Sequence, residues 1–231
     1  MQRTFLIIGG LTGIGAALKD RLKAEGHVVL TASRSPAPEG SEGHGVWDVR
    51  TPGGLDPERL PEALHGLVYC PGTINLMPFD RLIDDDFVAD FEVNLLGAVR
   101  AIRACLKALK ASGSGRILLF STVAVQSGFP YHASVSAAKG AVEGLTRALS
   151  AEFAPKITVN AIAPSLTDTP LAARLLRTDK QREAAEARNP MGQIGRPEDV
   201  ARFAAGLLTD ETNYITGQVF AIDGGQSTLR V

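Results

Sequence analysis

A glycine-rich turn after the first apolar run is the part of the chain whose residue types point most clearly to chemistry. Its glycines are spaced G-x-x-x-G-x-G, at Gly9, Gly13 and Gly15. Glycine lets the backbone turn sharply and approach a phosphate closely, and the helix start that follows offers free N–H groups to an anion. The turn therefore predicts a phosphate-bearing cofactor, although a tight strand-to-helix connection is the alternative. The candidate cofactor-binding residues are Gly9, Leu11, Thr12, Gly13 and Ile14.

Charge at the end of the second apolar run bears on which dinucleotide would bind. An acidic residue there accepts hydrogen bonds from an unmodified ribose and repels a 2′-phosphate. This chain has Ala32, Ser33 and Arg34 at that place, with no carboxylate. A guanidinium is suited to binding phosphate, so Arg34 favours NADP(H) over NAD(H). The alternative is that Arg34 is an ordinary residue of a surface loop.

The elements that must position these residues follow from alternating patterns. Short apolar runs alternate with longer stretches of helical periodicity, which is typical of β-α-β units around a parallel sheet. Since 231 residues suffice for one sizeable domain and are too few for a second of ordinary size, we expect a single doubly wound, Rossmann-type α/β domain over residues 1–231. Strands are expected at 5–8, 27–31, 67–69, 116–120, 157–161 and 218–222, and helices at about 14–25, 84–110, 134–152 and 197–208.

Residues 34–45 are rich in Pro, Gly, Ser and Glu, and they stand where a second crossover helix would normally lie. We expect that helix to be shortened or absent and the segment to form an ordered surface loop. A linker or a disordered segment is the alternative.

Composition excludes several classes of partner. Lys plus Arg (24) nearly balances Asp plus Glu (25), without a basic block or an acidic tail, so nothing favours nucleic acid or an anionic membrane. Cys70 and Cys105 lack metal-ligand spacing, and no apolar run approaches the roughly 20 residues that span a bilayer. The start of the chain reads as a strand and a turn and not as a leader. We expect a soluble protein in a reducing, cytoplasmic setting, with a small-molecule ligand and no metal.

The glycine turn and several later motifs, in the same order, resemble the short-chain dehydrogenases/reductases. Asp48-Val49 resembles the pair that meets the adenine, and Cys70-Pro71-Gly72 occupies the place of the Asn-Ala-Gly element, with Cys70 or Tyr69 replacing its asparagine. Residues 160–169 resemble the segment that closes over the nicotinamide. The cofactor contacts that this resemblance implies are Asp48, Val49, Cys70, Pro71, Gly72, Lys139, Pro164, Leu166, Thr167 and Thr169.

Further matches at residues 191–201 and 216–225 extend the resemblance over essentially the whole chain. It implies a parallel sheet of seven strands, with helices on both faces and a nicotinamide cofactor along the carboxyl edge. Family members usually pair through two long helices, so a homodimer or homotetramer is implied as well. One of those helices has a small apolar face that suits close packing, although a face that covers the sheet would look similar. That face consists of Ala98, Ala101, Ile102 and Cys105, and the other helix has a similar face of Ala141, Leu145, Ala148 and Leu149.

The resemblance places the catalytic residues of the family on this chain with one exception. In the family, a tyrosine in Tyr-x-x-x-Lys exchanges a proton with the substrate oxygen, and the lysine lowers the phenol pKa and binds the ribose. Lys139 is in place, but the residue four positions before it is Val135, which has no proton to give. Thr122 stands where the family has its serine, with Ser121 as the candidate if the register shifts by one. Asn94 resembles the asparagine that helps to hold the lysine.

Two of these residues have structural alternatives. Thr122 would then only bond the backbone at a strand end, and Asn94 would only hold a kink in its long helix.

Three hypotheses follow from the missing tyrosine. In the first, Tyr131, eight residues before Lys139, donates the proton, much as enoyl reductases of the same superfamily use a tyrosine further upstream; the alternative is that Tyr131 only packs in the pocket. In the second, Thr122, Lys139 and water support slow carbonyl reduction. In the third, the chain binds NADP(H) as a sensor or assembly subunit without turnover. The predicted function is NADP(H)-dependent reduction of a small carbonyl or enoyl substrate, with Asn94, Thr122, Tyr131 and Lys139 as catalytic candidates.

Residues 170–190 are expected to form the substrate loop. Its four arginines would attract an acidic substrate or a carrier-linked acyl chain, or they form a solvated helix face. These arginines are Arg174, Arg177, Arg182 and Arg188.

Overall fold

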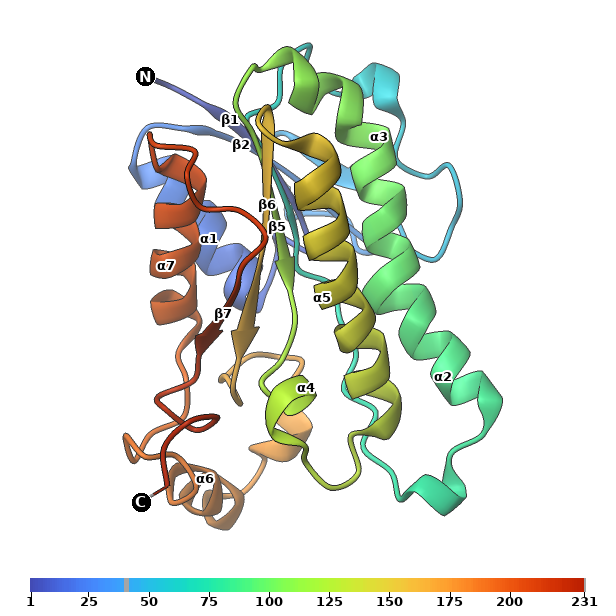
Figure 1. The fold of residues 1–231 in the computed structure, drawn as a ribbon, viewed down its shortest axis with the longest axis vertical. Helices are drawn as coiled ribbons and strands as arrows, with labels where there is room; N and C mark the ends of the chain where they lie inside the picture. The colour runs from blue at the N-terminus through green and yellow to red at the C-terminus, as the bar shows by residue number, and fades with distance from the viewer. Residues whose placement is uncertain (40–41, 231) are drawn as a thin grey trace.

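A seven-stranded parallel sheet forms the centre of the protein (Figure 1). The computed structural model describes residues 1–39 and 42–230. The strand order is β3-β2-β1-β4-β5-β6-β7, and each neighbouring pair is parallel. The expected doubly wound α/β fold is thus confirmed. The strands are β1 (Thr4–Ile8), β2 (Val28–Ser33), β3 (His44–Val46), β4 (Gly66–Tyr69), β5 (Gly115–Phe120), β6 (Ile157–Pro164) and β7 (Val219–Ile222).

Helices cover both faces of the sheet (Figure 1). Helices α1 (Gly13–Ala24) and α7 (Pro197–Thr209) pack against each other on one face, while α3 (Gly97–Ala111) and α5 (Ala133–Phe153) lie on the other. Helix α2 (Asp84–Phe91) leads into α3 through a π-helical segment, Glu92–Leu96. Short helices are α4 (Ala124–Ser127), α6 (Asp179–Glu186) and the 3₁₀ turns Pro57–Arg59, Phe79–Arg81 and Ala173–Leu175.

The apolar runs of the sequence become strands that are buried on both sides. In β1, Phe5 and Ile7 pack towards Leu18 of α1, whereas Leu6 and Ile8 face the opposite core, which contains Ala101 of α3. Side chains alternate between the two faces of a strand, and both faces are covered here, so the run is continuously apolar.

The structure corrects the sequence-based boundaries in three places. The seventh strand, β3, was not among the predicted strands, because it has three residues, none of them fully buried, and lacks an apolar run. It takes His44 and Gly45 out of the predicted loop. The described part of residues 34–45 contains no helix, and Gly40 and Ser41 lie outside the described residues. The predicted helix over 84–110 is interrupted by the π-helical segment.

The apolar face of α3 covers the sheet. Ala98, Ala101, Ile102 and Cys105 are all buried in the core beside β5 and β6. Alanine and cysteine let the helix approach the strands closely, so this face is not available for pairing two copies. Of the two interpretations that the sequence left open for this face, the α3 residues therefore have the one in which they cover the sheet.

The chain order places a crevice at one end of the sheet. From β1 the chain builds β2 and β3 on one side and then returns to build β4 to β7 on the other. At such a point the connections after neighbouring strands diverge, and ligands bind outside the carboxyl ends. The carboxyl end of β1 carries the glycine turn, and that of β4 carries Cys70, Pro71 and Gly72. Within the described residues, no helix has both the length and the apolar character needed to cross a bilayer.

Candidate active site

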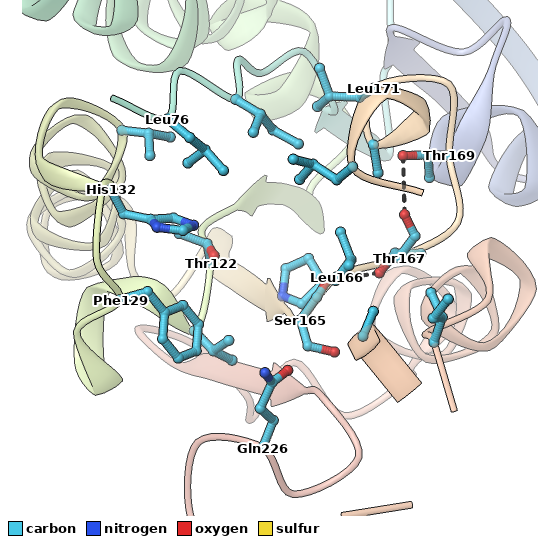
Figure 2. Close-up of a pocket in the computed structure, with 18 of the residues that line it drawn as sticks. Leu76, Thr122, Phe129, His132, Ser165, Leu166, Thr167, Thr169, Leu171 and Gln226 are labelled. Atoms are coloured by element: carbon cyan, nitrogen blue, oxygen red, sulfur yellow. Dashed lines mark hydrogen bonds between the residues drawn. The ribbon is translucent and has the colours of Figure 1, made fainter. Parts of the chain in front are cut away.

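A cavity of about 820 Å³ opens at the carboxyl ends of β4, β5 and β6 (Figure 2). Loops after these strands form its walls, together with the start of α5 and residues of α6. Much of the wall is apolar, with Leu76, Phe129, Leu166 and Leu171 among its side chains. The cavity unites ten of the residues predicted from the sequence: Ile14, Cys70, Gly72, Thr122, Tyr131, Lys139, Pro164, Leu166, Thr167 and Thr169.

The glycine turn has the shape of a phosphate cradle. Gly9 and Gly13 have φ angles of 80° and 55°, which other residues rarely adopt. A Cβ on Gly9 would lie 3.3 Å from Cys70 and Pro71, and one on Gly13 would lie 3.1 Å from Thr169. The turn therefore touches both other segments of the predicted cofactor site. The first N–H groups of α1 have no partner within the helix, so they are free to bind an anion.

Gly15 permits a close approach within this turn. A Cβ there would lie 2.3 Å from the carbonyl oxygen of Gly9. We expect Gly15→Ala to lower the free energy of unfolding by about 1–3 kcal/mol and to weaken NADPH binding, because the turn must shift. Thermal unfolding and a fluorescence titration with NADPH check this. Gly206→Ala is the control, because nothing lies within 4 Å of that added Cβ. Equal behaviour of the two variants would contradict the cradle.

At the predicted adenine end of the cofactor site, Asp48 forms an ion pair with Arg50. The Arg50 guanidinium lies 2.7 Å from a carboxylate oxygen of Asp48, and these hydrogen bonds lower the pKa of Asp48 to about 2. Val49 is buried beside α3, and its carbonyl accepts a hydrogen bond from Arg100. Arg34 is exposed immediately after β2. The acidic side chain near Arg34 is thus already neutralised, which leaves the positive charge of Arg34 at this edge.

Lys139 lies at the base of the cavity with its ammonium group buried. Its Nζ donates a hydrogen bond to the carbonyl oxygen of Phe120 over 2.8 Å. Burial lowers the pKa of Lys139 from 10.5 to about 8. A Cβ on Gly72 would lie 3.3 Å from Nζ and 3.2 Å from Oδ1 of Asn94. The absence of a side chain at Gly72 therefore lets Lys139 and Asn94 approach each other.

Asn94 has the structural role that the sequence left open, because its side chain is bonded within the distorted part of its helix. In the π-helical segment, its Nδ2 donates to the carbonyl of Asp90 (2.8 Å) and to the hydroxyl of Thr73 (2.7 Å), and its Oδ1 accepts from the Thr73 N–H (3.3 Å). Thr73 in turn donates to the buried carboxylate of Asp90. Asn94 thus holds the distortion and braces the backbone beside Lys139, as π-bulges at functional sites often do. Sequence reasoning missed Thr73 and Asp90, although Asp90 is one helical turn from Asn94.

The two candidate hydroxyls, those of Ser121 and Thr122, both belong to residues that line the cavity, but they differ in their hydrogen bonds. The Ser121 hydroxyl is buried and donates to Oε1 of Glu143 over 2.7 Å. The Thr122 side chain lines the cavity (Figure 2), and its Oγ1 accepts a hydrogen bond from the Ala124 N–H. A threonine hydroxyl that accepts one bond still has its own proton to donate. Among the hydrogen bonds of the described residues, the proton of the Ser121 hydroxyl is thus already donated, whereas that of Thr122 is not.

Cys70 and Tyr69, the two candidates for the asparagine position after β4, also differ in their surroundings. Cys70 lines the cavity, and burial raises the pKa of its thiol to about 12. Tyr69 instead packs in the core and donates to the carbonyl of Val93. Cys70, and not Tyr69, faces the site, and it does so as a neutral thiol.

Three residues at the start of α5 differ in how they meet the cavity. Val135 is buried in its wall, one helical turn before Lys139. Tyr131 has a φ of 69°, and its side chain lies in the cavity wall although it is 60% exposed. Its carbonyl accepts the Met77 N–H. The half-buried His132 extends into the cavity towards Thr122 (Figure 2). Sequence reasoning missed His132, although its place seven residues before Lys139 is a helical spacing that signals a shared face.

The substrate loop contributes few charges to the cavity. Arg182 pairs with Asp168 over 2.8 Å, and Arg174 donates to the carbonyl of Ile74. Arg188 is the arginine of this loop that lines the cavity. Among the described residues, no group of three or more His, Cys, Asp or Glu side chains is arranged to hold a metal ion.

Comparison with known proteins places this geometry in a family. Residues 58–227 match a family profile described as enoyl-(acyl carrier protein) reductase. The chain is 31% identical to the 3-oxoacyl-[acyl-carrier-protein] reductase of Thermotoga maritima over 95% of this chain and 96% of that protein. The chain belongs to the short-chain dehydrogenase/reductase family.

Solved structures of this family share the whole fold. Ligand-free aldohexose dehydrogenase of Thermoplasma acidophilum superposes with a TM-score of 0.92 at 26% identity, covering 99% of this chain and 95% of that one. A variant of actinorhodin polyketide ketoreductase with NADPH gives 0.90 at 27% identity, covering 99% and 98%. As a short-chain dehydrogenase/reductase, the chain is an oxidoreductase of a family that uses nicotinamide cofactors.

Proposed function

We propose that this short-chain dehydrogenase/reductase reduces a carbonyl or enoyl substrate with NADP(H), at a site where Val135 replaces the tyrosine of the family. One observation carries the proposal: a buried lysine and a strand-end hydroxyl share one cavity with Ile14, which directly follows Gly13 of the glycine turn. A reduced nicotinamide supplies a hydride when it is bound. Thr122 then positions the substrate oxygen, and Lys139, braced by Asn94, supplies positive charge beneath it.

The residues present fit such a cofactor. Backbone N–H groups of the glycine turn would hold the pyrophosphate, and Lys139 would bind the nicotinamide ribose. Asp48 and Val49 would meet the adenine, and Cys70, Pro71 and Gly72 would line the floor. The segment with Pro164, Leu166, Thr167 and Thr169 would cover the nicotinamide. The ketoreductase that shares this fold with NADPH supports the choice of cofactor.

The cavity wall supports an apolar substrate. Leu76, Phe129 and Leu171 offer no charge to bind, whereas a thioester chain or a bulky ketone would bury its hydrocarbon against them. The named reductase relative acts on 3-oxoacyl groups, so acetoacetyl coenzyme A is a suitable first probe. Crotonoyl coenzyme A and tropinone extend the test to an enoyl group and a cyclic ketone. Consumption of NADPH with any of them supports the proposal.

A binding role is the second candidate, and Val135 is the observation that favours it. Tight NADPH binding without turnover of all three probes would support a sensor or assembly subunit. We also propose that the chain forms a homodimer or homotetramer, as light scattering of the purified protein would show.

Arg34 provides a test of cofactor preference. We expect Arg34→Asp to weaken NADPH binding by about 10- to 100-fold, because a charge-assisted bond to phosphate contributes about 1.5–3 kcal/mol, and to favour NADH instead. Fluorescence titrations with both nucleotides measure the preference. Arg103→Asp is the control, since Arg103 is an exposed arginine of α3. A wild-type protein that prefers NADH would refute the assignment.

A further inference from the structure

We propose that His132 donates the proton to the substrate oxygen in this reduction. The inference rests on the proposed function and names the group that replaces the missing tyrosine. His132, Val135 and Lys139 have the spacing i, i+3 and i+7, which puts them on one face at the start of α5. All three line the cavity. In Figure 2 the imidazole projects from this end of α5 towards Thr122, the residue that would position the substrate oxygen.

The hydrogen bonding of the ring decides which nitrogen is available. Nδ1 of His132 lies 2.7 Å from the carbonyl oxygen of Pro130. A carbonyl only accepts, so Nδ1 carries a hydrogen, and Nε2 is the nitrogen that gains and loses a proton. The Phe129 ring packs edge-on against the imidazole, with ring centres 5.6 Å apart. These two contacts hold the ring in place with Nε2 at its far end.

The other proton-bearing groups of the cavity are less suited to act as the acid. No carboxylate lines the described cavity, and its titratable groups besides His132 are Cys70, Tyr131, Lys139 and Arg188. The thiol of Cys70 is held neutral by a pKa of about 12, and Nζ of Lys139 is bonded to the Phe120 carbonyl. The side chain of Tyr131 is 60% exposed, so solvent and not the cavity surrounds most of it. Imidazole gives up its proton near neutral pH.

The proposed step balances as follows. The hydride that a bound reduced nicotinamide would supply, leaving the nicotinamide oxidised, adds with its electron pair to the carbonyl carbon, and the π electrons of the C=O bond move to the oxygen. Nε2 of His132 gives its proton to that oxygen, so the product is an alcohol. The cationic imidazole becomes neutral with its hydrogen on Nδ1, still bonded to Pro130, and solvent restores the proton on Nε2.

The kinetic test uses His132→Gln with NADPH and acetoacetyl coenzyme A. We expect kcat to fall about 100- to 10,000-fold, with NADPH affinity unchanged. In the wild type, kcat/KM should decrease as pH rises, because the proton donor is lost, and this dependence should vanish in the variant. His27→Gln is the matched control, because His27 accepts the backbone N–H of Arg3 and lies outside the cavity wall. Adding Val135→Tyr to His132→Gln should restore reduction, which a misfolded variant would not allow.

A readout without turnover tests the tautomer. Ring ¹⁵N NMR of His132 in the NADP⁺ complex should show Nδ1 protonated throughout a pH titration and Nε2 exchanging its proton. An unprotonated Nδ1 would overturn the inference. An unchanged kcat in His132→Gln would also overturn the inference, as would a loss of kcat that occurs only in Tyr131→Phe. Either result would leave the proposed function intact. Absence of NADPH binding and of turnover in the wild type would overturn the function itself.

Discussion

Lys139→Met is expected to remove reduction and to stabilise the cofactor-free protein at neutral pH. The loss of turnover should be about 100- to 10,000-fold, the range for a group that assists proton transfer. The gain in stability has a separate origin. Folding lowers the pKa of Lys139 from 10.5 to about 8 by burial, which corresponds to about 3 kcal/mol against the folded state. Loss of the bond to Phe120 offsets about 1 kcal/mol, so the net gain is about 2 kcal/mol.

The pH dependence has a definite sign. Between pH 8 and 10.5 the unfolded chain keeps the proton that folded Lys139 has released, so the wild-type free energy of unfolding rises with pH in this window. Methionine lacks this titration, so the advantage of the variant should be present at pH 7 and disappear by pH 10.5. Urea unfolding at both pH values measures it.

The matched control is Lys107→Met, because Lys107 is exposed on α3. It should change neither turnover nor the pH dependence of stability. If Lys139→Met reduces the probes at the wild-type rate, the catalytic assignment of Lys139 is refuted. If the variant is less stable than the wild type at pH 7, burial of the ammonium group does not destabilise the folded protein.

Val135→Tyr is expected to accelerate carbonyl reduction. Val135 lies in the cavity wall one turn before Lys139, so a phenol there would enter the cavity beside the buried ammonium, which lowers a phenol pKa. Imidazole acids lose their proton between pH 5 and 8, so the gain should be largest above that range. At pH 9 we expect about 100-fold or more.

Val135→Phe is the matched control for this gain, since it adds the same ring without the hydroxyl. Rates with NADPH and acetoacetyl coenzyme A at pH 6 and pH 9 distinguish the variants. Equal rates for the tyrosine and phenylalanine proteins would show that a phenol at position 135 reaches no substrate oxygen.

The fold was largely predictable because its signals are local. A strand such as β1 is a continuous apolar run, and α1 repeats its apolar residues at helical spacing. Strand β3 was not predicted because backbone hydrogen bonds pair it with β2, and such bonds leave no trace in the sequence. Its three residues are little buried, so they also form no apolar pattern. The face of α3 was ambiguous for a similar reason, since the same small residues suit a sheet or a second helix.

Some residues of the candidate site were likewise predictable from local sequence, and others were not. Gly9, Gly13, Asn94, Thr122 and Lys139 were found because each belongs to a short motif with fixed spacing. Thr73 follows β4 and Asp90 lies in α2, so the hydrogen bonds that join Thr73 to Asp90 and to Asn94 link separate elements, which no short spacing reveals. The choice of Thr122 over Ser121 depended on Glu143, twenty-two residues away.

The sequence by itself determined the alternation of strands and helices, the phosphate cradle, the positive residue after β2 and the valine before the lysine, because these depend on residue type and near spacing. Only the tertiary structure showed that the Ser121 hydroxyl is bonded to Glu143, that Cys70 and not Tyr69 lines the cavity, and how far burial lowers the pKa of Lys139. It also placed His132 in the cavity wall with its ring directed towards Thr122, and it bonded Nδ1 of that ring to the Pro130 carbonyl. These properties arise where separate segments meet at the carboxyl edge of the sheet, and there burial and orientation, not residue type, set the chemistry.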